Sequence, residues 1–230
     1  MKKLLAVAGI LLFVGSSSFA AVPGLQLFIS GAQYDRWSQT WYTESSGFDL
    51  YVVSSGHVIN DVIVSVALAQ RDNPALADIN FNGHQINTSE WVNGYPPIDN
   101  IPEEFDPGDL PRHPIYPTWF TEMHTGEYTM NRMVGNVVPD RYTGNYWDPS
   151  TGIGQTEVAG DFKRFHIETG GSFTFVHFDA YAVRPNGAIW KYAPYSHDAQ
   201  MVANAPEPGT LAMLGIGLLG LGTYTRRRKQ

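Results

Sequence analysis

The segment from Ser172 to Val183 (SFTFVHFDAYAV) most strongly limits what this chain can fold into. Its side chains alternate between two faces with a period of two, as they do in a β-strand. Arg184-Pro185-Asn186-Gly187 follows, and Asn-Gly is a strong turn signal between two strands. Ile189 to Tyr192 then has the length and the apolar character of a partner strand. These residues predict a β-hairpin.

Three earlier segments also have the character of strands: Leu25 to Ile29, Phe48 to Val53 and Val62 to Ala69. The third is rich in β-branched residues, follows Asn60-Asp61 and predicts a buried central strand. Long helical periodicity is absent, apart from a weak turn at Pro74 to Asp78. We therefore predict an all-β fold, a single β-sandwich or jelly-roll-like domain.

The stretch from Asn93 to Pro117 is rich in proline and cannot form a regular central strand, because proline lacks the backbone donor that a sheet needs. We interpret it as one long ordered loop that crosses an end of the sandwich. Its acidic residues do not have the spacing of an EF-hand calcium loop, so a solvated acidic loop is the favoured interpretation. These residues are Glu103, Glu104, Asp106 and Asp109.

Residues 1–20 have the pattern of a secretory signal peptide. Lys2 and Lys3 precede an apolar run from Leu4 to Val14, and Ser18-Phe19-Ala20 fits the small-x-small cleavage site. The apolar run is shorter than the roughly 20 residues of a spanning helix, which disfavours an uncleaved N-terminal anchor.

The other end of the chain has the pattern of a second targeting segment, residues 206–230. Pro206, Glu207 and Pro208 precede an apolar run from Leu211 to Tyr224, and a basic tail follows. We predict a short transmembrane segment at about 210–224. Basic side chains at the end of such a segment stay at the cytoplasmic interface of the membrane. In this chain they are Arg226, Arg227, Arg228 and Lys229. On length alone, a buried core helix is the competing interpretation.

This C-terminal order of triplet, apolar run and basic end resembles the PEP-CTERM sorting signal, a profile also labelled an ice-binding protein C-terminal domain. The resemblance implies a Gram-negative bacterium, export by the general secretion machinery and a transient anchor in the inner membrane. It also implies processing by an exosortase near the triplet, a final place at the cell surface or outside the cell, and an association with exopolysaccharide and biofilm. It says nothing about the ectodomain, and no Thr-x-Thr ladder supports ice binding.

Residues 21–205 remain between the two targeting segments, enough for one domain of ordinary size. They contain no cysteine, so disulfides, zinc fingers and thiol nucleophiles are excluded. Nine basic residues stand against 21 acidic ones, a net charge of −12. Such an acidic domain is a poor nucleic-acid binder, and we predict no nucleic-acid partner.

Several stretches of this ectodomain together resemble the choice-of-anchor N proteins, bacterial ectodomains that are attached to alternative surface anchors. The resemblance implies no enzymatic activity and no ligand. It is carried by Gly47 to Tyr51, Gly108 to His113, Pro117 to Phe120, His177 to Asp179 and Ala193 to Ala199.

Two histidine–aspartate pairs are the main candidates for chemistry. His177 and Asp179 share one strand face, and His197-Asp198 follows the next hairpin, so the two pairs could meet. A metal site needs three or more converging ligands, and a hydrogen-bonded core or rim pair is the favoured interpretation. We predict no metal ligand, no cofactor and no catalytic residue.

Four aromatic residues could stack on sugar rings if they are exposed: Trp37, Trp41, Tyr146 and Trp147. Trp37 and Trp41 are four residues apart and would share one face of a strand. Packing in the core is the favoured alternative, because large aromatic side chains dominate protein interiors.

Three functions remain open. The first is a non-enzymatic surface or extracellular-matrix protein processed by an exosortase. The second is a carbohydrate-binding module that uses exposed aromatic rings. The third is a secreted glycoside hydrolase, which needs two carboxylates about 5 to 10 Å apart across a cleft.

Overall fold

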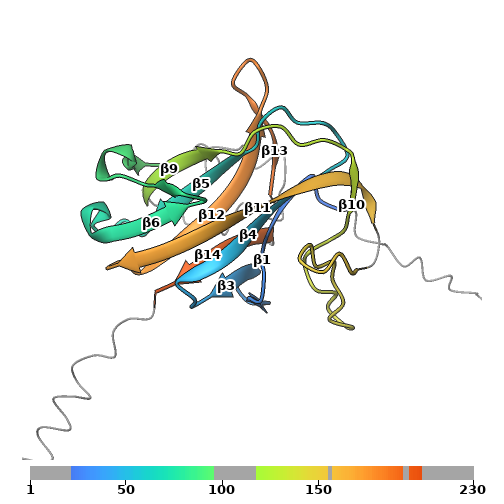
Figure 1. Cartoon of the computed structure of the whole chain (residues 1–230), viewed down its shortest axis with the longest axis horizontal. Helices are drawn as coiled ribbons and strands as arrows, with labels where there is room; N and C mark the ends of the chain where they lie inside the picture. Colours follow the sequence, from blue (N-terminus) through green and yellow to red (C-terminus); the bar gives the residue numbers. More distant parts are fainter. Residues whose placement is uncertain (1–21, 96–117, 155–156, 194–196, 204–230) are drawn as a thin grey trace, which may run out of the picture.

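The computed structural model describes residues 22–95, 118–154, 157–193 and 197–203. Within these ranges the chain forms two β-sheets that face each other, with short 3₁₀ turns at Pro74–Leu76 and Thr88–Glu90 (Figure 1). The all-β prediction is confirmed.

The first sheet, sheet A, has the strand order β1-β4-β11-β6-β7, with β10 paired to β11. All its pairings are antiparallel. The bounds are β1 Leu25–Ile29, β4 Gly47–Ser55, β6 Ala77–Phe81, β7 His84–Gln85, β10 Arg132–Val134 and β11 Val158–Gly171.

The second sheet, sheet B, has the order β2-β3-β14-β12-β5-β9-β8, with β13 paired to β12. One of its pairings, between β14 and β3, is parallel. The bounds are β2 Gln33–Asp35, β3 Thr40–Thr43, β5 Ile63–Leu68, β8 Val92–Gly94, β9 Thr118–His124, β12 Phe175–Val183, β13 Ile189–Tyr192 and β14 Asp198–Val202.

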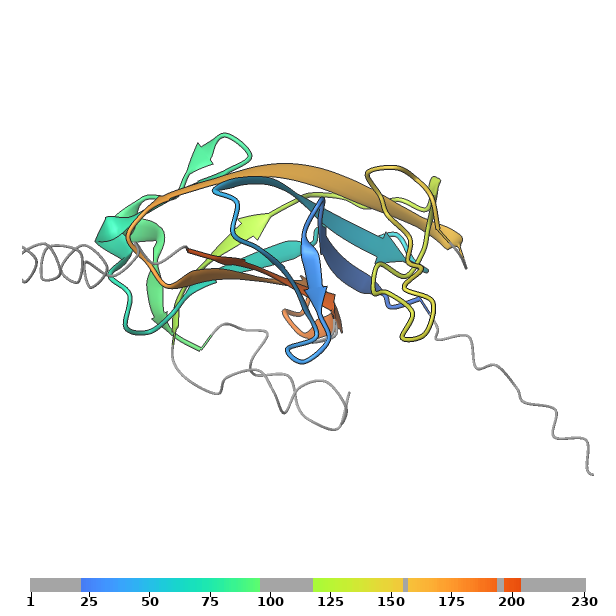
Figure 2. The same cartoon turned by 90° about the horizontal axis from the view of Figure 1, so that it is seen from below.

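The main core lies between the two layers, which are seen edge-on in Figure 2. Alternate side chains of β4 and β12 point inward, and the rings of Phe48 and Phe178 meet edge to face at 6.0 Å. Leu50, Val64 and Val176 are fully buried in the same cluster. Burial of these apolar side chains is the main force that holds the sheets together.

A second layer of packing covers the part of the outer face of sheet A around β1. Strand β1 is buried on both sides, because residues 135–154 lie over the side chains that point away from sheet B. Tyr146 and Trp147 pack there against Phe28 and Phe162 of the sheet. This layer belongs to the same hydrophobic cluster as the main core.

The predicted strands are present. The bounds of β1 and β13 are those predicted, and β4, β5 and β12 differ from their predicted ranges by one to three residues. The hairpin turn differs in detail: Gly187 has a positive φ of 83°, whereas Asn186 does not, and the pairing shifts register between Ala182 and Val183. The turn is therefore not the two-residue type I′ form, which needs a positive φ at both central residues.

One local interpretation was wrong. Trp37 and Trp41 do not share a strand face, because β2 ends at Asp35 and β3 begins at Thr40. Trp37 lies in the turn between the two strands, and a polar turn sequence explains why the strand is interrupted there.

Several predictions lie outside the described residues. These are the signal peptide, most of the proline-rich loop, the triplet Pro206 to Pro208, the apolar run and the basic tail. In the parts that the structure does describe, no helix could span a membrane.

Candidate functional site

A histidine and two aspartates come together on the face of sheet B that is turned away from sheet A. His177 and Asp179 alternate with the core residue Phe178 on β12, and Asp198 lies on the neighbouring strand β14. The imidazole Nε2 of His177 is 3.2 Å from Oδ1 of Asp179 and 3.8 Å from Oδ2 of Asp198. We call these three residues the His–Asp–Asp cluster.

The orientation of the imidazole is fixed from its other side. Gln200 is the register partner of His177, and its Oε1 lies 3.3 Å from His177 Nδ1. An amide oxygen only accepts hydrogen bonds, so a neutral ring with its proton on Nδ1 would donate to Gln200. Nε2, which faces both carboxylates, is then the nitrogen that carries the lone pair in the neutral ring.

The cluster is buried although it lies on an outer face. Asp198 is fully buried and Asp179 nearly so, while 17% of the His177 side chain is exposed. Among the described residues, this is the one group of at least three His, Cys, Asp or Glu side chains whose ligand atoms all lie within 4.8 Å of one another. Two buried carboxylates side by side favour a cation between them, because burial of negative charge is costly.

The prediction that the two His/Asp pairs could meet holds for Asp198 and not for His197. His197 lies just before β14, which begins at Asp198, and its Nε2 contacts Oδ1 of Asn136 at 3.0 Å instead. Burial lowers the pKa of the His197 imidazole to about 3, so this ring is neutral at pH 7.

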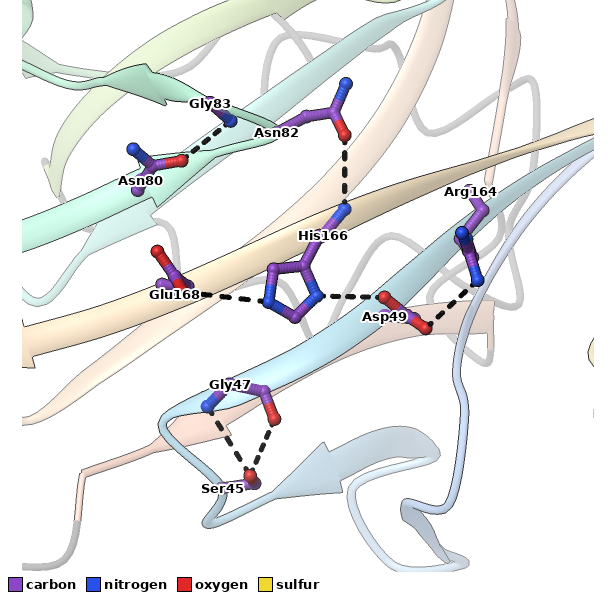
Figure 3. Close-up of polar contacts among 9 residues, drawn as sticks. All are labelled: Ser45, Gly47, Asp49, Asn80, Asn82, Gly83, Arg164, His166 and Glu168. Atoms are coloured by element: carbon purple, nitrogen blue, oxygen red, sulfur yellow. Dashed lines mark hydrogen bonds and ion pairs between the residues drawn. The ribbon is translucent and has the colours of Figure 1, made fainter.

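A second His/Asp group lies on the outer face of sheet A and shows the opposite environment. Nδ1 of His166 is 3.0 Å from Oδ1 of Asp49, and the charged groups of Arg164 and Glu168 flank the pair at 3.7 and 3.9 Å (Figure 3). The side chain of His166 is 57% exposed. Exposed ion pairs of this kind contribute little to stability.

The turn between β6 and β7 borders this exposed group. Asn82 and Gly83 both have positive φ, 52° and 89°, which is the signature of a type I′ hairpin turn. Asn82 accepts a hydrogen bond from the backbone N–H of His166 and donates its own N–H to the His166 carbonyl. This Asn-Gly turn was not predicted from the sequence.

The four candidate stacking residues have different environments. Trp41 and Trp147 are only 2% exposed and belong to the hydrophobic core, so their rings cannot stack on a ligand. Tyr146 is partly buried against the same core. Trp37 is 90% exposed and is the one member of the set that fits a surface role.

A further exposed ring, Tyr142, lies near Trp37 and is outside this set of four. It is 89% exposed, and the guanidinium of Arg36 donates to the carbonyl of Arg141 at 3.0 Å. This bond joins the turn that carries Trp37 to the turn that carries Tyr142. An exposed aromatic ring has no strong signal in the sequence, since core aromatic residues have the same composition around them.

An aspartate holds each of these two turns. Asp35 accepts from the backbone N–H groups of Trp37 and Ser38, and these bonds lower the pKa of its carboxyl. Asp140 does the same for Thr143 and Tyr142, with the same direction of pKa shift. Both rings are therefore presented on turns whose backbone is fixed by hydrogen bonds.

A polar groove lies beside the Trp37 turn, on the face of sheet B that also carries the cluster. Asp35 and Ser38, which flank Trp37, contribute to its wall. The other lining residues are Gln33, Tyr34, Thr40, Tyr42, Gln200 and Val202. Gln200 thus borders the groove and also contacts His177.

No curated protein matches the chain. Residues 204–229 match the family of the PEP-CTERM protein-sorting motif. This motif directs export and membrane-associated sorting by an exosortase, and it begins two residues after β14 ends at Val202. The chain is therefore an exported protein that carries a PEP-CTERM sorting motif and is targeted to an exosortase.

Proposed function

We propose that this protein is a non-catalytic component of the cell surface or extracellular matrix, associated with exopolysaccharide and biofilm in a Gram-negative bacterium. The observation that carries the proposal is the order of the chain: a β-sheet domain followed at once by the sorting motif at residues 204–229. An exosortase would process the tail and leave the acidic domain outside the cell.

Several aspartates of the domain have structural contacts, which supports a non-catalytic role for the protein. Asp72 accepts from the N–H and the hydroxyl of Thr174, Asp148 from Ser150, and Asp161 from Thr129. These acids cap turns and tie loops together, which is a common structural use of aspartate.

The finer parts of the proposal extend to both ends of the chain and to the ectodomain. We propose a signal peptide at residues 1–20, a transient anchor at about 210–224 and an ectodomain of the choice-of-anchor N kind with a jelly-roll-like sandwich. Two stretches that carry this resemblance lie on interior strands of the two sheets: Gly47–Tyr51 on β4 of sheet A and His177–Asp179 on β12 of sheet B.

Fractionation of cultures tests the proposal. In the parent strain, the processed protein should copurify with extracellular polysaccharide and become soluble when that polysaccharide is depolymerised. In a strain without exosortase, it should stay with the inner membrane. An identical distribution in both strains, or turnover of the polysaccharide by the purified protein, would contradict the proposal.

Carbohydrate binding is the second candidate, and the exposure of Trp37 and Tyr142 on two joined turns favours it. Aromatic rings fixed on rigid turns lose little conformational entropy when a ligand stacks on them. The adjacent groove offers hydroxyl, amide and carboxylate groups that suit the hydroxyls of a sugar. Trp41 and Trp147 have no part in this version of the proposal.

A glycan array probed with the exported protein tests this candidate. Trp37→Ala and Tyr142→Ala should each weaken any glycan signal about 5-fold or more, as expected for loss of one aromatic stacking contact of about 1–3 kcal/mol. Ile153→Ala is a matched control, because Ile153 is 73% exposed and lies in a different turn. A signal that survives both aromatic substitutions would exclude this surface.

A further inference from the structure

We propose that the His–Asp–Asp cluster binds one divalent transition-metal ion, with Zn²⁺ as the best fit. The three ligand atoms would be Nε2 of His177, Oδ1 of Asp179 and Oδ2 of Asp198. The ion would join β12 to β14, the last described strand before the sorting motif. The inference rests on the geometry of the cluster and is independent of the matrix function.

Two of the three distances between the ligand atoms agree with a tetrahedral zinc site, and the third is at most 4.8 Å. Zinc binds imidazole nitrogen and carboxylate oxygen at about 2.0–2.2 Å. Two ligands at the corners of a tetrahedron of that size are about 3.4 Å apart. The observed separations from His177 Nε2, 3.2 Å and 3.8 Å, lie on either side of that value.

The contact with Gln200 prepares the imidazole for a metal. Metal-binding histidines usually donate their second ring N–H to an oxygen acceptor, which fixes the tautomer and the ring plane. The Gln200 Oε1 at 3.3 Å from Nδ1 has this role here. It leaves Nε2 as a lone-pair donor that faces two carboxylate oxygens, an arrangement that a cation between the three atoms would stabilise.

A buried hydroxyl next to the cluster supports the assignment independently. Ser65 lies on β5 directly opposite Asp179, so the two side chains share one face at a distance of a few ångströms. Its Oγ is fully buried and has no hydrogen-bond partner among the described residues. Buried hydroxyls are rarely left unpaired. A water molecule in the fourth position of a zinc site would give this hydroxyl a partner.

The donor set distinguishes zinc from calcium. Calcium binds about six to eight oxygen ligands at about 2.3–2.6 Å, whereas one imidazole nitrogen with two carboxylates suits zinc and related transition metals. The side chain of His177 is 17% exposed, so the cluster borders the solvent. An ion here would hold β14 in place while the tail beyond Val202 is processed.

Metal analysis of the exported protein tests the proposal. The protein is purified from the producing cell, stripped with a chelator and titrated with ZnCl₂. We expect about one zinc ion per chain, as for a three-ligand site with one open position. His177→Gln and Asp198→Asn should abolish stoichiometric binding. His166→Gln is the matched control, because it removes an exposed histidine that also contacts an aspartate, and it should bind zinc like the parent.

A second measurement keeps the test decisive if Asp198→Asn does not fold. Co²⁺ added to the unmodified protein should give the intense visible absorption of tetrahedral coordination, and Zn²⁺ should displace it. Failure of the unmodified protein to bind zinc, equal zinc binding in His177→Gln and the parent, or binding of Ca²⁺ in place of Zn²⁺ would each overturn the proposal.

Discussion

Gln26 and Val137 are 111 residues apart in the chain and share a fully buried hydrogen bond of 3.0 Å, in which the Val137 N–H donates to Oε1 of Gln26. The same amide donates through Nε2 to the carbonyl of Gly135, also at 3.0 Å. One side chain on β1 thus satisfies two backbone groups of the layer formed by residues 135–154. Buried backbone groups need such partners, so this amide is what allows the loop to cover the sheet.

The substitution Gln26→Leu should therefore destabilise the domain although it makes β1 more apolar. It leaves a backbone N–H and a carbonyl buried without partners, at about 1–3 kcal/mol each. We expect the free energy of unfolding to fall by about 2–5 kcal/mol in denaturant titrations. Gln33→Leu, at an exposed position of β2, is the control and should change stability by less than about 0.5 kcal/mol. Equal effects would show that the buried bonds contribute nothing.

Removal of the ring should lower the stability strongly at Trp147 and hardly at all at Trp37. Trp147 is 2% exposed and packs edge to face on Phe162 at 5.5 Å, so Trp147→Ala should cost about 3–5 kcal/mol of stability. Trp37→Ala removes an exposed ring and should stay within about 0.5 kcal/mol of the parent. Thermal unfolding followed by circular dichroism measures both. A large loss for Trp37 would mean that its ring is packed in solution.

Gly83 should be intolerant of a side chain for a purely conformational reason. A Cβ at Gly83 would meet no atom within 4 Å, yet its φ is 89°, a left-handed conformation that costs an L-residue about 1–2 kcal/mol. Gly83→Ala should lower stability by that amount. Gly47→Ala is the matched control, because Gly47 has the same open space without a positive φ, and it should be neutral or slightly stabilising. Equal losses would refute the conformational explanation.

Alternation and turn chemistry made the hairpin of β12 and β13 predictable, as well as β1, because these segments carry their signal locally. The longest strand, β11 (Val158–Gly171), was not predicted. Its sequence places Lys163, Arg164 and His166 between apolar residues, and charged residues lower the apparent strand character. It is a strand because β4 and β6 pair with it on both sides, which is tertiary information.

The candidate site was predictable only in part, for the same reason. The spacing of His177 and Asp179 put them on one face, but which strand lies beside β12 depends on the sheet order β14-β12-β5. That order brings Asp198 and Ser65 to the cluster, whereas His197, just before β14, contacts Asn136. The burial of Trp41 and Trp147 likewise depends on residues 135–154 folding back over β1, and no local sequence pattern predicts that fold.

His197 should make stability fall as the pH is lowered from neutral. Its pKa is lowered by burial to about 3 in the folded state, against about 6.5 in an unfolded chain. The folded form therefore binds fewer protons than the unfolded form between these two pKa values. The contribution of His197 to the free energy of unfolding is complete above pH 6.5 and is lost as the pH falls toward 3. A single group of this kind gives a slope of about 1.4 kcal/mol per pH unit.

Denaturant titrations between about pH 7 and pH 5 measure this slope, because the aspartates and glutamates of an unfolded chain titrate mainly below that range, near pH ~4. His197→Gln should flatten the slope while keeping a polar group near Asn136. An equally steep slope in His197→Gln would assign the acid sensitivity to other groups.

The sorting motif can be tested apart from the domain. Glu207→Ala, or deletion of Arg226 to Lys229, alters the triplet or the basic end of the matched segment and should leave an unprocessed form in the membrane fraction. Glu44→Ala, an exposed change of the same kind on the sheet domain, should be processed like the parent. Immunoblots of membrane and medium fractions distinguish the two forms by size. Release of the Glu207→Ala protein in the same amount as the parent would show that the triplet is not needed for processing.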